Sequence, residues 1–304
     1  MALLRRFDLD PIVAVWPSTA EGAASILRRY EDAGLRPAVW PMLDDAEGRW
    51  VNADNLGAFT DYVERLADAL APSEMVLDLE PAIARVKASL GEGSLHFKKL
   101  SLAGGGEAFA RARAALVALV DRLHARGLRV SAAVPAPVLL DSIRGPRPYQ
   151  EQLGTPVDGP RWDHVSPMLY SSILEGWSRG ALRRADARAL TAALASMTRE
   201  RHPEIGGASL GAVGVGAFGD EPVYRGPEEL RDDVGLARAA GLDDLALFDL
   251  GGVLHRPPAE AWLEAFTEAP ALPGPPGLTL RARALLGAAR LAGKALSFGR
   301  GPDE

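Results

Sequence analysis

Short apolar runs alternate with longer segments of helical periodicity along most of the chain. The first run, Ile12-Val-Ala-Val-Trp16, contains no polar position and ends at Pro17, which is typical of a strand buried on both faces. Apolar residues then recur at helical spacing over 23–30, and Gly34 follows where a helix would end. This strand-then-helix unit is the pattern that the rest of the chain repeats.

Six further apolar runs predict strands, and five helical patterns separate or follow them. The predicted strands are 37–43, 74–80, 128–134, 164–170, 208–218 and 245–250, and the predicted helices are 54–70, 107–126, 181–201, 227–240 and 258–268. Such alternation implies parallel strands joined by right-handed crossovers. No G-x-G-x-x-G follows the first strand, which argues against a dinucleotide-binding fold. The sequence therefore predicts an α/β fold, a (β/α)8 TIM-type barrel.

The eighth strand of that barrel is harder to place. Residues 95–102 could supply it, but they could equally form a loop over the barrel mouth, so an incomplete or seven-stranded barrel stays open. We expect the barrel to occupy 1–269 and the Pro/Gly-rich segment 270–277 to be a stiff linker. Residues 278–304 predict a basic amphipathic helix, which could pack on the barrel or contact a partner or a membrane surface.

Composition and charge exclude several classes of function. The 304 residues carry a net charge of -6, which disfavours nucleic-acid binding, and they include no cysteine, which excludes disulfides and thiolate chemistry. No apolar run is long enough to cross a membrane, and the N-terminus lacks the pattern of a secretory signal, so we expect a cytoplasmic protein. The five histidines are scattered, and we expect no metal site and no cofactor.

Asp78-Leu-Glu80 is the strongest chemical signal. Residues two apart in a strand project to the same face, so both carboxylates would point into the barrel mouth. Two carboxylates in one cleft cannot both ionise cheaply, which raises one pKa and can keep a general acid protonated. We expect Glu80 to be this member, substantially buried and with a raised pKa. The same pair could instead cap loop amides, pair with an arginine or hold a divalent cation.

Other candidates lie at the same ends of the predicted strands, where such barrels place their active sites. We expect the aromatic rings of Trp16 and Trp40, and those of Trp50, Trp162 and Trp177, to offer flat faces to sugars or to pack loops. The loop acids Asp44, Asp45, Asp220 and Glu221 are expected to be solvated, with lining of the cleft as the alternative. The remaining strand-end candidates are Met168, Tyr170, Phe248 and Asp249.

The order of these motifs resembles the family 18 glycoside hydrolases, the chitinase-like barrels. Leu77-Asp-Leu-Glu80 is similar to the end of their D-x-x-D-x-D-x-E motif, and Pro167-Met-Leu-Tyr170 resembles their M-x-Y strand end. Ser131-Ala-Ala-Val-Pro135 looks like their next strand, and 245–248 lies where their last strand carries a sugar-stacking tryptophan. The resemblance covers 74–250.

The resemblance implies roles for three residues. Glu80 would protonate the glycosidic oxygen, Asp78 would stabilise a substrate N-acetyl group that acts as the nucleophile, and Tyr170 would hydrogen-bond that acetamide. Trp16, Trp40, Met168, Phe248 and Asp249 would bind the carbohydrate. The sequence departs from the motif at four positions, which are Ser73, Val76, Ser171 and Phe248.

We therefore predict a glycoside hydrolase-like enzyme with a carboxylate general acid that cleaves or binds a carbohydrate, for which the resemblance implies N-acetyl amino sugars. Two alternatives stay open at this point. One is a catalytically silent carbohydrate-binding barrel, and the other is a metal-assisted enzyme that uses the same carboxylate pair on a small metabolite.

Overall fold

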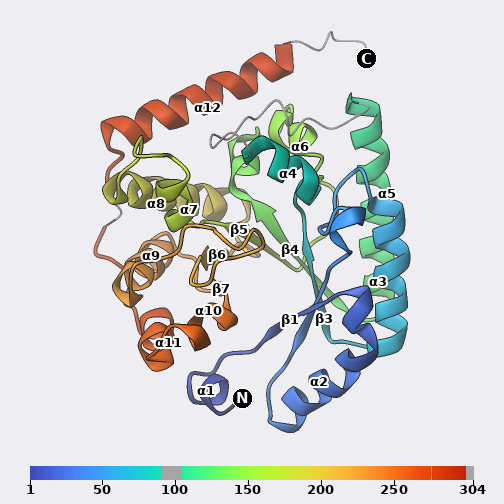
Figure 1. Cartoon of the computed structure of the whole chain (residues 1–304). Helices are drawn as coiled ribbons and strands as arrows, with labels where there is room; N and C mark the ends of the chain where they lie inside the picture. Colours follow the sequence, from blue (N-terminus) through green and yellow to red (C-terminus); the bar gives the residue numbers. More distant parts are fainter. Residues whose placement is uncertain (91–104, 275, 299–304) are drawn as a thin grey trace. The chain divides into compact units, whose positions relative to one another are not determined.

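The computed structural model describes residues 1–90, 105–274 and 276–298 (Figure 1). The predicted strand at 95–102 lies outside these ranges. By its internal contacts the chain divides into two units. Unit 1 comprises residues 1–138 and 147–164, and unit 2 comprises residues 139–146 and those from 165 onward.

Unit 1 is built on four parallel strands, in which neighbours in the sheet are consecutive in the chain. The strands are β1 Ile12–Val15, β2 Ala38–Pro41, β3 Glu74–Asp78 and β4 Arg129–Pro135. The helices are α1 Ala2–Arg6, α2 Ala20–Asp32, α3 Leu56–Leu70, α4 Ile83–Leu90, α5 Gly105–Ala125 and α6 Pro148–Leu153. Short 3-10 turns lie at Pro17–Thr19 and Asp45–Glu47, and a third, Ala136–Leu140, follows β4.

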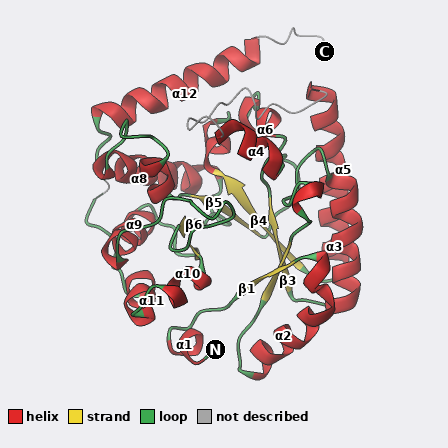
Figure 2. Cartoon of the chain, in the orientation of Figure 1, coloured by secondary structure: helices red, strands yellow, loops and turns green. Residues whose placement is uncertain are grey.

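The core of unit 1 lies between this sheet and its helices. The helices α2, α3 and α5 contact β1, β2 and β4 respectively, and Figure 2 shows them along one side of the strands. Val39 of β2 pairs with Met75 of β3, and both side chains are fully buried, as are Phe59 of α3 and Leu116 of α5. This face of the sheet is therefore closed by apolar packing.

Unit 2 repeats the pattern with three parallel strands, again in chain order. They are β5 His164–Met168, β6 Ala208–Gly211 and β7 Leu245–Phe248. The helices are α7 Ser171–Gly176, α8 Arg184–Arg201, α9 Pro227–Ala239, α10 Leu250–His255, α11 Ala259–Thr267 and α12 Leu280–Phe298.

The last helix packs onto α8 through one face. Ala282 and Leu286 of α12 join a buried cluster with Leu182, Ala189 and Leu190. The hydroxyl of Thr279 donates to the Asp186 carboxylate at 2.5 Å and accepts the Ala282 amide at 3.1 Å. This helix lies within the segment 278–304, while the predicted domain boundaries stay a prediction.

The fold class agrees with the sequence. In the described residues seven parallel strands alternate with helices, the pattern of an incomplete or seven-stranded (β/α) barrel, so the predicted α/β barrel class is confirmed. Two details differ. The predicted strand 208–218 ends at Gly211, because a glycine-rich loop follows, and the short helices α1, α6, α7 and α10 have no counterpart among the predicted elements.

Candidate functional site

The two faces of β3 differ in how deeply they are buried. Met75, Leu77 and Leu79 are fully buried. Glu74, Val76 and Glu80, which alternate with them, are half-buried. The side of the sheet that carries Glu74 and Val76 is called the open side. Asp78 lies on it because alternate residues of a strand share a face, and Glu80, just past the strand end, continues the alternation. That both carboxylates point into the barrel mouth stays a prediction.

Asp78 is the buried member of the pair. Its side chain is only 4% exposed, and its Oδ1 atom has no hydrogen-bond partner among the described residues. Loss of water around the carboxyl raises the pKa of Asp78 to about 8. Asp78 therefore carries a proton at neutral pH.

Glu80 lies two residues beyond Asp78 and just past the end of β3. Glu80 is half-buried, so the expectation that it is the substantially buried member of the pair is wrong. Pro81 follows it, and α4 begins at Ile83. Of the two residues, Glu80 is the more exposed.

Trp40 and Asp78 each pair with an alanine of a neighbouring strand. Trp40 of β2 pairs with Ala14 of β1, and Asp78 pairs with Ala133 of β4. Trp40, Ala14 and Ala133 are all half-buried. The two alanines leave the indole and the carboxyl without a bulky neighbour at these pairing positions. Trp16 lies two residues after Ala14, is half-buried, and donates its backbone N–H to Thr19 Oγ1 at 3.0 Å.

In unit 2, Tyr170 and Phe248 form a stacked pair. Their ring centroids are 5.6 Å apart with an interplanar angle of 11°, and the Tyr170 hydroxyl lies 3.0 Å from Ser209 Oγ. A Cβ at residue 211 would meet the Phe248 carbonyl at 2.8 Å and the Tyr170 ring at 3.3 Å, so Gly211 permits this close approach. Phe248 therefore presents one ring face to Tyr170. Met168, which pairs with Ser209, is half-buried beside them.

Unit 2 contains a second acidic pair. Asp249 follows the end of β7, and Glu221 lies in the loop after β6. Asp249 caps α10, where its Oδ1 accepts the Gly252 amide at 2.5 Å. Glu221 is buried and accepts the amides of Ala217 at 2.8 Å and Phe218 at 3.3 Å. Burial and, to a lesser extent, the negative charge of Asp249 raise the pKa of Glu221.

The prediction that the loop acids are solvated is therefore wrong for Glu221, although Asp220 is exposed. The loop folds over the Glu221 carboxylate so closely that a Cβ at Gly216 would overlap it. The glycines of 211–219 were the sequence signal for this close packing.

Ser171, where the family motif carries an acid, serves a buried network instead. It is fully buried and donates to Asp233, and Arg184 donates to both of them, with 2.9 Å between Arg184 Nη2 and Asp233 Oδ1. Tyr224 donates to Asp233 at 2.8 Å. These residues join the starts of α7 and α8 to α9. Because Ser171 is fully buried, its hydroxyl serves this hydrogen-bond network and is not exposed to a ligand.

Two of the five candidate tryptophans belong to the core. Trp50 is 3% exposed and Trp162 is 6% exposed, and the Trp162 Nε1 donates to the Val157 carbonyl at 2.8 Å. The sugar-stacking interpretation is wrong for both, because their rings are covered by protein. Trp177 is half-buried and meets Phe218 edge-on at 6.1 Å.

The predicted site residues thus fall into two groups. Unit 1 brings Asp78 and Glu80 onto the same side of the sheet as Trp40, with Trp16 at the end of β1. Unit 2 brings together Met168, Tyr170, Phe248 and Asp249 at the ends of β5 and β7. Each residue lies at the carboxyl end of its own strand. The catalytic and substrate-binding roles of all eight stay predictions.

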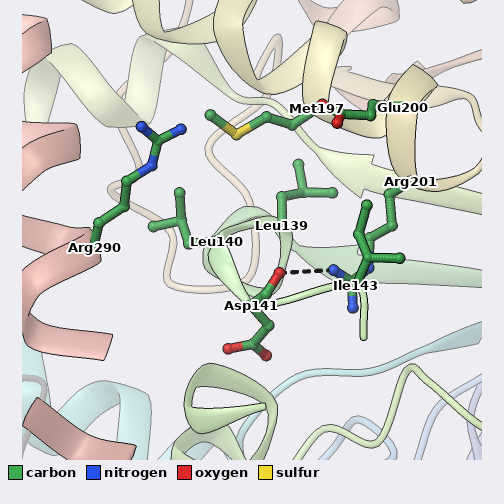
Figure 3. Close-up of a pocket in the computed structure, with 8 residues that line it drawn as sticks. All are labelled: Leu139, Leu140, Asp141, Ile143, Met197, Glu200, Arg201 and Arg290. Carbon is green, nitrogen blue, oxygen red and sulfur yellow. Dashed lines mark hydrogen bonds between the residues drawn. The ribbon is translucent and has the colours of Figure 1, made fainter. Parts of the chain in front are cut away.

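A small cavity in unit 2 contains none of these residues (Figure 3). It measures about 190 Å³ and lies between the segment 139–143, the end of α8 and Arg290 of α12. Within it, Arg201 donates to the Asp141 carbonyl at 2.9 Å.

The described residues contain no group of three or more His, Asp or Glu side chains placed to hold a metal ion. No helix in the described ranges has the length and apolar character needed to cross a membrane.

The chain shares its fold with glycoside hydrolases of known structure. The β-glucosidase from Thermotoga maritima in complex with deoxynojirimycin matches with a TM-score of 0.54 and 14% identity, covering 82% of this chain and 75% of that chain. The chitinase RmChi1 from Rhizomucor miehei matches with a TM-score of 0.53 and 12% identity, covering 86% of this chain and 94% of that chain. No protein-family model matches the sequence, and no curated protein matches it either. These likenesses show a glycoside hydrolase-like TIM-barrel fold.

Proposed function

We propose that this chain is a glycoside hydrolase that cleaves oligosaccharides of N-acetyl amino sugars by a substrate-assisted route. The observation that carries the proposal is the carboxyl pair at the end of β3, in which Asp78 is buried and Glu80, two residues later, is half-buried. The resemblance of 77–80 to the family 18 motif supports the same assignment of roles.

Glu80 acts as the general acid because it is the more exposed residue of the pair. It gives its proton to the glycosidic oxygen while the carbonyl oxygen of the neighbouring acetamide attacks the anomeric carbon, so the glycosidic bond breaks and a cyclic oxazolinium ion forms. Water then opens this ion and returns a proton to Glu80. Two displacements at the same carbon retain its configuration.

Asp78 stabilises the positive charge that develops on the acetamide. Burial favours the neutral form of this carboxyl, and its Oδ1 atom has no hydrogen-bond partner among the described residues. Oδ1 can therefore accept the acetamide N–H, and this hydrogen bond strengthens as positive charge develops on the acetamide, while the proton stays on Asp78. An interaction that strengthens along the reaction path lowers the barrier without tightening the binding of the substrate.

The test of this route is a comparison of two substrates that differ only in the acetyl group. We expect the protein to release reducing sugars from β-linked N-acetylglucosamine oligomers and none from the corresponding glucosamine oligomers, because the latter lack the attacking carbonyl. Proton NMR of the first product should show the β-anomer. Equal cleavage of both substrates, or release of the α-anomer, would contradict the route, and binding without cleavage would identify a silent carbohydrate-binding barrel.

Trp40 is proposed to stack on a sugar ring next to the acid pair, because it is half-buried on the same side of the sheet. We expect Trp40→Ala to raise the dissociation constant for the oligosaccharide roughly tenfold, in line with the energy of one aromatic contact. Calorimetric titration measures this effect, and kcat should change little. Trp40→Phe keeps a ring and should retain most of the affinity, whereas unchanged binding in Trp40→Ala would remove this residue from the site.

A further inference from the structure

The C-terminal helix α12 exposes an apolar face that its packing on α8 does not use. Ala282, Leu286 and Gly293 are buried and mark the side that faces the protein. Each residue turns the helix by 100°, so most of the other leucines and alanines of α12 project away from this side, toward solvent. Leu280 is 82% exposed and Leu291 68% exposed. The other exposed apolar residues of the helix are Ala284, Leu285, Ala288, Ala292, Ala295 and Leu296.

The charges of α12 are all positive. Its four ionisable residues are Arg281, Arg283, Arg290 and Lys294, and it contains no Asp or Glu, although the whole chain has a net charge of -6. Arg283 and Lys294 are exposed, lie three helical turns apart on one stripe, and form no ion pair within the described part of the chain. Arg281 is within 3.9 Å of Asp186, and Arg290 lines the cavity of Figure 3.

Packing against α8 does not account for these features. The contacts with Leu182 and Leu190 bury the side of Ala282 and Leu286. These contacts leave the side chains of Leu280 and Leu291 exposed to solvent. An exposed apolar face beside cations, with no anion on the helix, is the pattern of a helix that lies in the interface of a bilayer. Its leucines enter the acyl boundary while its basic side chains reach the headgroups.

We propose that α12 docks the protein on an anionic lipid surface, with the face of Leu280 and Leu291 in the interface and Arg283 and Lys294 on lipid phosphates. The charge complementarity selects anionic over zwitterionic lipid, because each basic residue near such a surface strengthens binding roughly fivefold. This surface is separate from the strand-end carboxyls, and the inference does not depend on the proposed hydrolase activity.

Co-sedimentation of the full chain with vesicles tests the charge requirement. We expect binding to vesicles of phosphatidylglycerol and phosphatidylcholine and little binding to pure phosphatidylcholine. The double variant Arg283→Gln/Lys294→Gln should bind the mixed vesicles roughly 25-fold more weakly. The control Arg28→Gln/Arg29→Gln removes the same charge from exposed positions of α2 and should bind like the wild type. Equal losses in both variants would show a dependence on net charge alone and overturn the proposal.

A second pair of variants tests the apolar face. Leu280→Ala/Leu291→Ala should weaken vesicle binding on the order of tenfold, because side-chain carbons leave the interface. Ile26→Ala/Leu254→Ala, which trims exposed residues of α2 and α10, should not. Circular dichroism confirms that each variant is folded. Absence of vesicle binding by the wild type would overturn the proposal, as would sedimentation velocity showing a dimer that the leucine variant dissociates, since that result assigns the face to a second copy of the chain.

Discussion

Replacing Glu80 by glutamine is expected to lower turnover of the N-acetylglucosamine oligomer by on the order of 10²–10⁴. Glutamine preserves the shape of the side chain and a hydrogen bond but has no proton to transfer. Because that proton moves only in the transition state, the affinity for the intact oligomer should stay close to that of the wild type. The measurements are kcat from the release of reducing ends and a dissociation constant from calorimetric titration.

Glu74→Gln is the matched control for this change. Glu74 is a half-buried glutamate on the same face of β3, six residues before Glu80, and it accepts a hydrogen bond from Ser131 that glutamine can also accept. We expect its turnover to match that of the wild type. Full turnover in Glu80→Gln would remove Glu80 from the chemistry, and equal losses in the two variants would indicate a general effect on the strand.

The geometry of the carboxyl pair could be read from the sequence, but its electrostatics could not. A period of two along 74–80 places Asp78 and Glu80 on one face whatever the rest of the chain does. Depth of burial depends on neighbours that are remote in sequence. Val51 donates its amide to the Asp78 carbonyl at 3.0 Å, and Ala133 of β4 pairs with Asp78, and neither contact has a local signal. The sequence therefore predicts one buried carboxyl with a raised pKa but assigns it to Glu80, whereas Asp78 is the buried member and Glu80 is half-buried.

The outcomes for the other candidates have the same origin. Trp50 and Trp162 are almost fully buried, which decides between sugar stacking and packing in favour of packing. Glu221 looks like a loop acid, yet the glycine-rich chain before it closes over its carboxylate. Strand position predicts which end of the sheet a side chain occupies. Loop conformation decides whether that side chain meets solvent, and no periodicity encodes it.

Stability should fall as pH rises through the neutral range, and Asp78→Asn should remove the part of this dependence that Asp78 contributes, while Glu221, whose pKa burial also raises, retains its own. The folded protein holds a proton on Asp78 up to about pH 8, whereas an unfolded aspartate releases it near pH 4. Between these values the folded state binds more protons than the unfolded state, so the free energy of unfolding decreases with pH. The stabilising contribution of the neutral carboxyl is complete below about pH 4 and is lost as the pH passes 8.

The slope expected from a single group is about 1.4 kcal/mol per pH unit. Asparagine is uncharged at every pH, so Asp78→Asn should match the wild type near pH 4 and exceed its free energy of unfolding by several kcal/mol near pH 8. Urea denaturation at intervals between pH 4 and pH 9 measures both curves, and Asp121→Asn on the exposed side of α5 is the control that should follow the wild type. If the free energies of unfolding of Asp78→Asn and wild type differed by the same amount at every pH in this range, Asp78 would be ionised in the folded protein. In that case Asp78 would meet the substrate as a carboxylate, and the role proposed for it as a neutral hydrogen-bond acceptor for the acetamide would be wrong.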